Sequence, residues 1–241
     1  MMMSPESSTR FVVAGCSRSG TTYTAKLMSA LGYPCGHERI FNIWRIYGLG
    51  ELSDPMTAFY GSDAKQGDAS FLSIPYLDQL PEGTVVLHQI RNPLEVIRSH
   101  MGIRFFADPY EQSIYLANEH PQIIDFLRDH SPEIFEADTE VGRCMRYWYY
   151  WNRFAERAKA NPALIYLRYR VEDIDTGILR QVLEKITRNF SEEKCREALD
   201  LVSKTTNTRP RDTVWTWDKL PSGKDKEQIV ELSRSYGYLS Q

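Results

Sequence analysis

The sequence predicts an α/β protein in which a mostly parallel central sheet is flanked by helices. Short apolar runs at residues 11–14, 84–90 and 163–167 each have the length of a buried strand. Segments with helical patterning follow the first two runs directly, and strands that alternate with helices favour a parallel sheet. The middle of the chain, about residues 102–161, is expected to be helical, and it includes the aromatic segment MRYWYYWNRF.

The composition of the 241-residue chain is that of an ordinary globular protein. Its hydrophobic share is 42%, its charged share is 25%, and its formal net charge is −3. We expect a single domain over residues 1–241, with a flexible N-terminus at about residues 1–10. The small negative charge argues against a nucleic-acid partner, because such proteins use a broad basic surface.

The sequence contains no segment that suggests a membrane span or a secretory signal. No apolar stretch approaches the ~20 residues that a membrane-spanning helix needs. The N-terminal residues MMMSPESST lack the apolar region of a signal peptide. The four cysteines are scattered without the spacing of a metal site. We therefore expect a cytoplasmic protein with free thiols.

The most informative segment is a strand, a loop and a helix near the N-terminus. The predicted strand Phe11–Ala14 is followed by the loop Gly15–Thr22 and by a helix over residues 21–31 that ends at Gly32. A glycine-bounded loop that enters a helix directs several backbone N–H groups at one point. These donors, together with the helix dipole, suit a phosphate or a similar anion. A simple turn with a solvated arginine is the alternative interpretation.

This loop differs from the common nucleotide-binding pattern G-x-x-x-x-G-K-[ST] at one position. Gly15, Gly20 and Thr22 fit the pattern, but Thr21 stands where the lysine is expected. That lysine normally reaches the outer phosphates of ATP or GTP. The cation of this loop is Arg18, three residues earlier in the chain.

A second motif follows the predicted strand at residues 84–90. The strand ends at Arg91, and Pro93 suits the first turn of a helix from Leu94 to about His100. Ser99 lies eight residues after the arginine, about two helical turns on. In an open α/β sheet, ligands bind outside the carboxyl ends of the strands, which is where Arg91 is expected.

With both motifs in this order, the chain resembles the sulfotransferases that use 3′-phosphoadenosine 5′-phosphosulfate (PAPS). The segment RSGTT matches the loop of the tyrosylprotein and carbohydrate-type members, and IRNPLEVIRS matches the second signature of the family. The resemblance implies a P-loop NTPase-like three-layer sandwich. It also implies that one motif binds the 5′-phosphosulfate and the other binds the 3′-phosphate. The implied contacts are Arg18, Ser19, Gly20, Thr21 and Thr22 for the first motif, and Arg91 and Ser99 for the second.

The resemblance extends more loosely into the last third of the chain. Leu167-Arg168-Tyr169, followed by Val171-Glu172-Asp173, is similar to a family segment that comes after the third strand. In the family pattern, the tyrosine and the acidic pair lie closer together than they do here. The resemblance implies that Tyr169 contacts the adenine side of the cofactor.

The resemblance also implies a reaction and the residues that carry it. The sulfuryl group would pass in line from PAPS to an acceptor hydroxyl, with Arg18 stabilising the departing phosphate. Cys35-Gly36-His37-Glu38 is similar to the C-G-E-E segment of tyrosylprotein sulfotransferases, in which the second acid is the base. Glu38 is therefore the expected general base. His37 is the alternative, because its unperturbed pKa of about 6.5 suits proton transfer.

The acceptor is expected to be a carbohydrate, a lipid or a small molecule with a hydroxyl, and residues 102–161 are expected on the acceptor side. Neither the acceptor nor the oligomeric state follows from the sequence. No metal is expected to be required. A kinase of the same scaffold would need a loop lysine and an acidic magnesium ligand after a strand, but Thr21 and Arg91 occupy those places. A nucleotide-binding module without catalysis is the third possibility.

Overall fold

The computed structural model describes residues 9–63, 66–109, 113, 121–187, 189–203 and 214–240. The chain divides into two compact units. Unit 1 comprises Met1–Ile90 and Ala155–Thr208, and unit 2 comprises Arg91–Phe154 and Arg209–Gln241. That residues 1–241 form one domain stays a prediction, and most of the expected flexible N-terminus lies outside the described residues.

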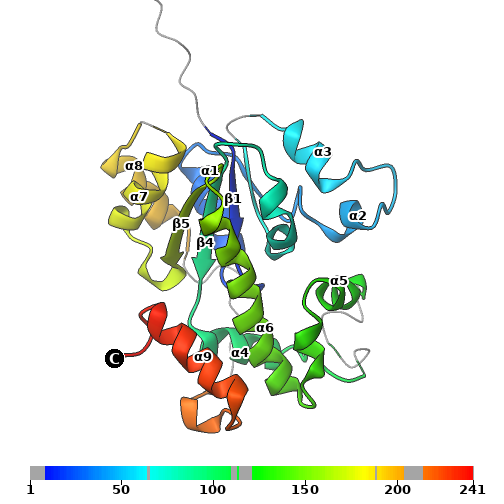
Figure 1. Cartoon of the computed structure of the whole chain (residues 1–241). Helices are drawn as coiled ribbons and strands as arrows, with labels where there is room; N and C mark the ends of the chain where they lie inside the picture. Colours follow the sequence, from blue (N-terminus) through cyan, green and yellow to red (C-terminus); the bar gives the residue numbers. More distant parts are fainter. Residues whose placement is uncertain are drawn as a thin grey trace, which may run out of the picture. The chain divides into compact units, whose positions relative to one another are not determined.

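Unit 1 is built on a five-stranded sheet in which every pairing is parallel (Figure 1). The spatial order of the strands is β2-β3-β1-β4-β5. The strands are β1 (Phe11–Ala14), β2 (Cys35–His37), β3 (Gly67–Ala69), β4 (Val85–Ile90) and β5 (Ile165–Arg170). The all-parallel sheet confirms the predicted α/β class, and β1 and β4 lie within one residue of their predicted bounds.

The third predicted strand was placed too early in the chain. Its predicted range is 163–167, but β5 runs from Ile165 to Arg170 and pairs with β4 along its whole length. The apolar run at residues 163–167 did not mark the bounds of the strand, because the side chains of β5 point alternately to the two faces of the sheet. Leu167 and Tyr169 face the core, whereas Tyr166 bonds to His88 on the other face of the sheet. Tyr169 is therefore part of the strand and does not follow it.

The chain leaves the central strands of the sheet in opposite directions. From β1 it passes through α1 (Thr21–Ala30) to β2 at one edge, and from β4 it eventually returns to β5 at the other edge. Neighbouring strands whose connections diverge in this way form a switch point, where α/β sheets bind ligands beyond the carboxyl ends of the strands. In this sheet the switch point lies between β1 and β4.

Helices α1, α7 (Thr176–Ile186) and α8 (Glu192–Leu201) pack on one face of this sheet and form a hydrophobic core with it (Figure 1). Phe11, Val13 and Leu87 point into this core and meet apolar side chains of the three helices. The 3₁₀ helix η1 (Phe71–Gln79) contacts β1. The other helical elements that the structure describes in unit 1 are α2 (Ile43–Ile46), α3 (Pro55–Tyr60), η4 (Glu156–Ala160) and η5 (Val171–Asp173).

The regular elements that the structure describes in unit 2 are all helices. They are α4 (Pro93–Met101), α5 (Gln122–His130), η3 (Pro132–Glu136), α6 (Glu140–Ala155), η6 (Trp217–Lys219) and α9 (Lys224–Ser235). Of the predicted helical stretch at residues 102–161, most of residues 122–160 is helical, residues 102–109 form turns, and residues 110–112 and 114–120 lie outside the described residues. The aromatic segment lies in α6, where Tyr147, Trp148 and Trp151 are fully buried. Those three rings therefore stabilise the core of unit 2. Within the described ranges, no helix combines the length and the apolar character needed to cross a membrane.

Candidate active site

The loop between β1 and α1 makes a tight turn directly before the helix begins. The amide of Ser19 donates to the carbonyl of Cys16 at 3.1 Å, and the turn places Arg18 at φ 68° and Gly20 at φ 89°. Gly20 is the N-cap of α1 and has no side chain that could bond to the first turn. The first N–H groups of a helix lack partners within the helix. The start of α1 therefore has the donors and the dipole of an anion site.

A buried amide beneath the loop fixes its position. Gln89 lies near the end of β4 with no exposed surface, and its side-chain Nε2 donates to the carbonyl of Ser19 at 2.7 Å. Its Oε1 accepts hydrogen bonds from the hydroxyls of Thr24, at 2.5 Å, and Tyr169, at 2.8 Å. The side-chain amide thus joins β4, β5, α1 and the loop. Gln89 was not among the predicted site residues, although a polar side chain near the end of a buried strand was a visible signal.

Tyr169 is buried among the core side chains of unit 1 and is 6% exposed. Burial raises the pKa of its phenol, so the hydroxyl stays protonated and donates to Gln89. The structure therefore places Tyr169 beneath the loop, where it supports Gln89. Its predicted contact with the cofactor stays a prediction.

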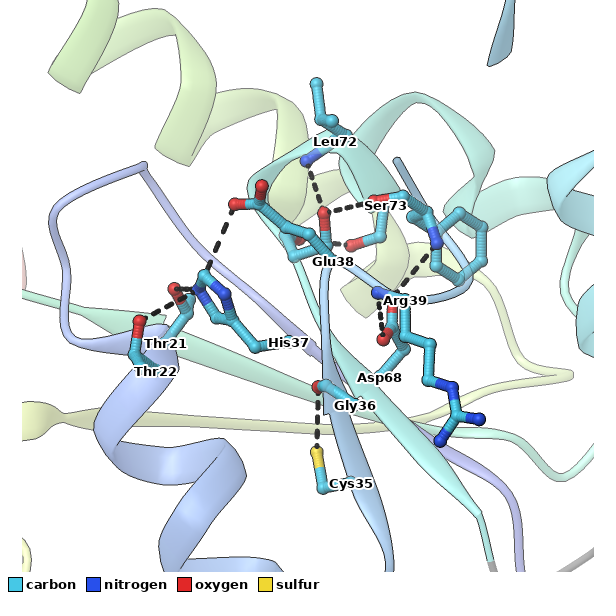
Figure 2. Close-up of polar contacts among 12 residues, drawn as sticks. Thr21, Thr22, Cys35, Gly36, His37, Glu38, Arg39, Asp68, Leu72 and Ser73 are labelled. Carbon is cyan, nitrogen blue, oxygen red and sulfur yellow. Dashed lines mark hydrogen bonds and ion pairs between the residues drawn. The ribbon is translucent and has the colours of Figure 1, made fainter. Parts of the chain in front are cut away.

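The predicted base lies at the end of β2, on a second strained turn. The backbone of Glu38 has φ 52°, and its amide donates to the carbonyl of Ala69 at 3.1 Å. Its carboxylate is 26% exposed, and Oε1 lies 3.9 Å from Nε2 of His37 (Figure 2). A partly exposed carboxylate at the carboxyl edge of the sheet is placed to accept a proton from a bound hydroxyl.

Asp68 of β3 holds the turn that carries Glu38. Its Oδ1 accepts a hydrogen bond from the amide of Arg39 at 3.0 Å (Figure 2). Its Oδ2 accepts a hydrogen bond from the amide of Phe41 at 2.9 Å. Asp68 is fully buried, and that burial raises its pKa from 3.8 to about 6 even though the backbone hydrogen bonds act in the opposite direction. Asp68 was not among the predicted site residues either. A lone acid in a short strand between Gly67 and Ala69 was the available signal.

His37, the last residue of β2, contacts the start of α1. Its Nε2 lies 3.1 Å from the hydroxyl of Thr21 and 3.0 Å from that of Thr22 (Figure 2). Burial, and to a smaller extent the charge of Arg18, lowers the pKa of the imidazole from 6.5. Both candidate bases and both threonines of the predicted phosphate site are thus together in unit 1.

The second motif lies in unit 2, at the start of α4. Asn92 caps this helix by accepting the amide of Leu94 at 2.9 Å, and Pro93 occupies the first helical position. Arg91 directly precedes this cap, and one of its guanidinium nitrogens lies 3.7 Å from Glu95. Ser99 lies in the helix, 6% exposed. The predicted strand–arginine–helix order is therefore present, with the helix starting at the proline.

Two other histidines have contacts typical of structural residues. His88 is fully buried in β4, and its Nδ1 lies 2.6 Å from the hydroxyl of Tyr166. His100 is fully buried in α4, where its Nδ1 donates to the carbonyl of Val96 and its ring packs edge-on against Tyr147.

Comparisons with known proteins bear on the fold. No protein-family model matches the sequence, and a search of curated proteins finds no match. Among solved structures, the chain is similar to the crystal structure of the mouse sulfotransferase SULT7A1 complexed with PAP. The TM-score is 0.50 and the sequence identity is 11%, over 97% of this chain and 86% of the mouse chain. At this identity the likeness shows the fold alone. It confirms the predicted fold class, which this chain shares with a sulfotransferase.

Proposed function

We propose that the protein is a sulfotransferase that moves the sulfuryl group of PAPS to a hydroxyl of an acceptor. The observation that carries the proposal is the grouping at the start of α1. Arg18, two threonine hydroxyls, an imidazole and a carboxylate meet at an uncapped helix N-terminus. This grouping offers anion binding and proton transfer in one place. The shared fold with a sulfotransferase supports the same interpretation.

The proposed donor contacts fall into two groups. The loop residues Arg18, Ser19, Gly20, Thr21 and Thr22 bind the 5′-phosphosulfate through backbone amides, hydroxyls and the guanidinium. Arg91 and Ser99 bind the 3′-phosphate, which is the group that distinguishes PAPS from ATP. Arginine suits both tasks because its planar, permanently charged group forms several hydrogen bonds to phosphate oxygens.

The proposed reaction is a single in-line displacement at sulfur. The acceptor oxygen forms a bond to sulfur as the bond between sulfur and the bridging oxygen of the 5′-phosphate breaks. The electron pair of that bond stays on the phosphate oxygen, where the fixed charge of Arg18 stabilises it. The acceptor proton passes to the carboxylate of Glu38 as the general base. His37 is the second candidate for this base, because the imidazole lies beside Glu38 and its lowered pKa keeps it neutral.

The proposed acceptor is a carbohydrate, lipid or small-molecule hydroxyl in the cytoplasm, with the described residues of 102–161 on the acceptor side. No metal is needed for the step, because the sulfuryl group carries less negative charge than a phosphoryl group.

Transfer of radiolabelled sulfate tests this proposal. The purified protein is incubated with labelled PAPS and with panels of carbohydrate, lipid and small-alcohol acceptors, in EDTA. Labelled product that forms equally well with and without EDTA supports the proposal. If phosphate from ATP is transferred instead, and EDTA abolishes the transfer, the protein is a kinase. If PAP binds but neither donor is used, it is a nucleotide-binding module.

A further inference from the structure

The imidazole of His37 occupies the place where the two threonine hydroxyls of the loop converge. Both hydroxyl oxygens lie within 3.1 Å of its Nε2, and these threonines are the first two residues of α1. A neutral imidazole nitrogen carries either one lone pair or one proton. It can therefore form one good hydrogen bond with this pair of hydroxyls, and the arrangement leaves donor capacity that an anion can use.

We propose that His37 is a ligand of the 5′-phosphosulfate, and that it takes up a proton when the nucleotide binds. This inference rests on the proposed function and assigns His37 a binding role in place of a catalytic one. An anion that accepts hydrogen bonds from Thr21 and Thr22 draws their hydroxyls away from the ring. The protonated Nε2–H then becomes a third donor, with a positive charge beside the phosphate.

Partial burial and the charges around His37 disfavour its protonated form before the nucleotide arrives. Arg18 faces it from the loop and disfavours a second positive charge, while Glu38 lies 3.9 Å away on its own segment. Its partner on β3 is Ala69, and the first turn of α1 carries no acidic residue. Burial is the larger cause and the charge of Arg18 the smaller one, and together they lower the pKa of His37 from 6.5 in the free protein. A bound phosphate reverses this balance, because it adds negative charge next to the ring.

Nucleotide binding and protonation of His37 are linked, so the proposed proton uptake can be measured through the binding affinity. If the bound anion raises the pKa of His37, then protonation of His37 must raise the affinity for the anion by the same factor. Each pKa unit of that shift corresponds to about tenfold in affinity. Adenosine 3′,5′-bisphosphate (PAP) should therefore bind more tightly as the pH falls toward the pKa of the imidazole.

Calorimetric titration with PAP tests the proposal in three proteins: the wild type, His37→Gln and His130→Gln. Heats measured in buffers of different ionisation enthalpy give the number of protons taken up on binding. His130 is the matched control, because burial also lowers its pKa but it has no proposed contact with the nucleotide. The phosphates of PAP titrate near pH 6 as well, so the comparison between proteins isolates the contribution of the imidazole.

The expected result is proton uptake by the wild type and by His130→Gln that His37→Gln lacks. Below pH 6.5, His37→Gln should also bind PAP about tenfold more weakly than the wild type. If His37→Gln keeps both the affinity and the proton uptake, the inference is wrong. If it keeps them but loses sulfate transfer, His37 is the base. If no protein binds PAP at any pH, the proposed function itself fails. A thermal melt of each variant confirms that it is folded.

Discussion

At the residue scale, both side chains that are proposed to act on the reacting group lie on strained backbone. Arg18 has φ 68° and Glu38 has φ 52°, in a region that costs an L-residue roughly 1–2 kcal/mol. Such strain persists where neighbouring groups fix the conformation, and it is often found at functional sites. Here the fixing groups are the carbonyls of Cys16 and Ala69, which accept the amides of Ser19 and Glu38.

Substitutions at Arg18 should separate stability from catalysis. Glycine adopts a positive φ without steric cost, so Arg18→Gly should be more stable to unfolding than Arg18→Ala by about 1 kcal/mol. Both variants should lose sulfate transfer, because neither has the guanidinium. Urea unfolding and the transfer assay measure the two effects. Transfer that survives in both variants would remove Arg18 from the mechanism.

Replacement of Glu38 tests the assignment of the base. Glu38→Gln keeps the shape of the side chain but cannot accept a proton, so turnover should fall by about 10²–10⁴-fold. Affinity for PAP should stay the same, because the carboxylate has no proposed contact with the nucleotide. Turnover with PAPS and calorimetry with PAP measure the two quantities. Full turnover in this variant would show that another group takes the proton.

At the scale of elements, the phosphate loop depends on a buried side chain from another strand. Gln89→Leu removes the hydrogen bonds to Ser19, Thr24 and Tyr169 and leaves their polar groups buried. The cost should be about 1–3 kcal/mol of unfolding free energy, and PAP should bind more weakly. Gln181→Leu, at an exposed position of α7, is the matched control and should change neither quantity. Equal behaviour of the two variants in urea unfolding and PAP titration would contradict this role.

The free energy of unfolding should depend on pH, because the buried carboxyl of Asp68 has a raised pKa in the folded protein. The folded state holds the proton of this carboxyl with a pKa of about 6, against 3.8 for the unperturbed group. Between about pH 4 and pH 6 the folded state binds more protons than the unfolded chain, so the unfolding free energy falls as the pH rises. The full difference is at most about 3 kcal/mol, and Asp68→Asn should remove it.

Urea unfolding at several pH values between 4 and 6 measures this contribution. Asp54→Asn is the control, because Asp54 also accepts two backbone amides but is exposed, and its pKa is lowered. The control should keep the slope of the wild type over this range. If Asp68→Asn keeps that slope as well, the carboxyl of Asp68 is not its source.

Some helices and strands could be predicted because the sequence marks them locally. β1, α1 and β4 follow from short apolar runs and from glycine or proline at their ends. β2 and β3 have three residues each, so they carry too few side chains to show a period, and their pairing depends on contacts distant in the chain. The same limit applies to Gln89 and Asp68. Each acts on a segment far from it in sequence, so only the fold reveals its partner.

At the scale of the whole molecule, the two nucleotide motifs lie on different units. The loop at Gly15–Thr22 is in unit 1, whereas Arg91 and Ser99 are in unit 2. The fold is shared with a sulfotransferase, but a P-loop scaffold serves many reactions, so the fold alone does not set the donor. The proposed donor carries a 3′-phosphate, and ATP does not. Binding of a 3′-phosphate therefore distinguishes the proposed sulfotransferase from a kinase.

The most direct test of a donor with a 3′-phosphate is a thermal-shift comparison of PAP with magnesium–ATP. A ligand that binds only the native state raises the melting temperature by mass action. The account predicts a clear shift with PAP in EDTA, little shift with magnesium–ATP, and loss of the PAP shift in Arg91→Ala. A shift with magnesium–ATP and none with PAP would contradict the account and identify the protein as an ATP-dependent enzyme.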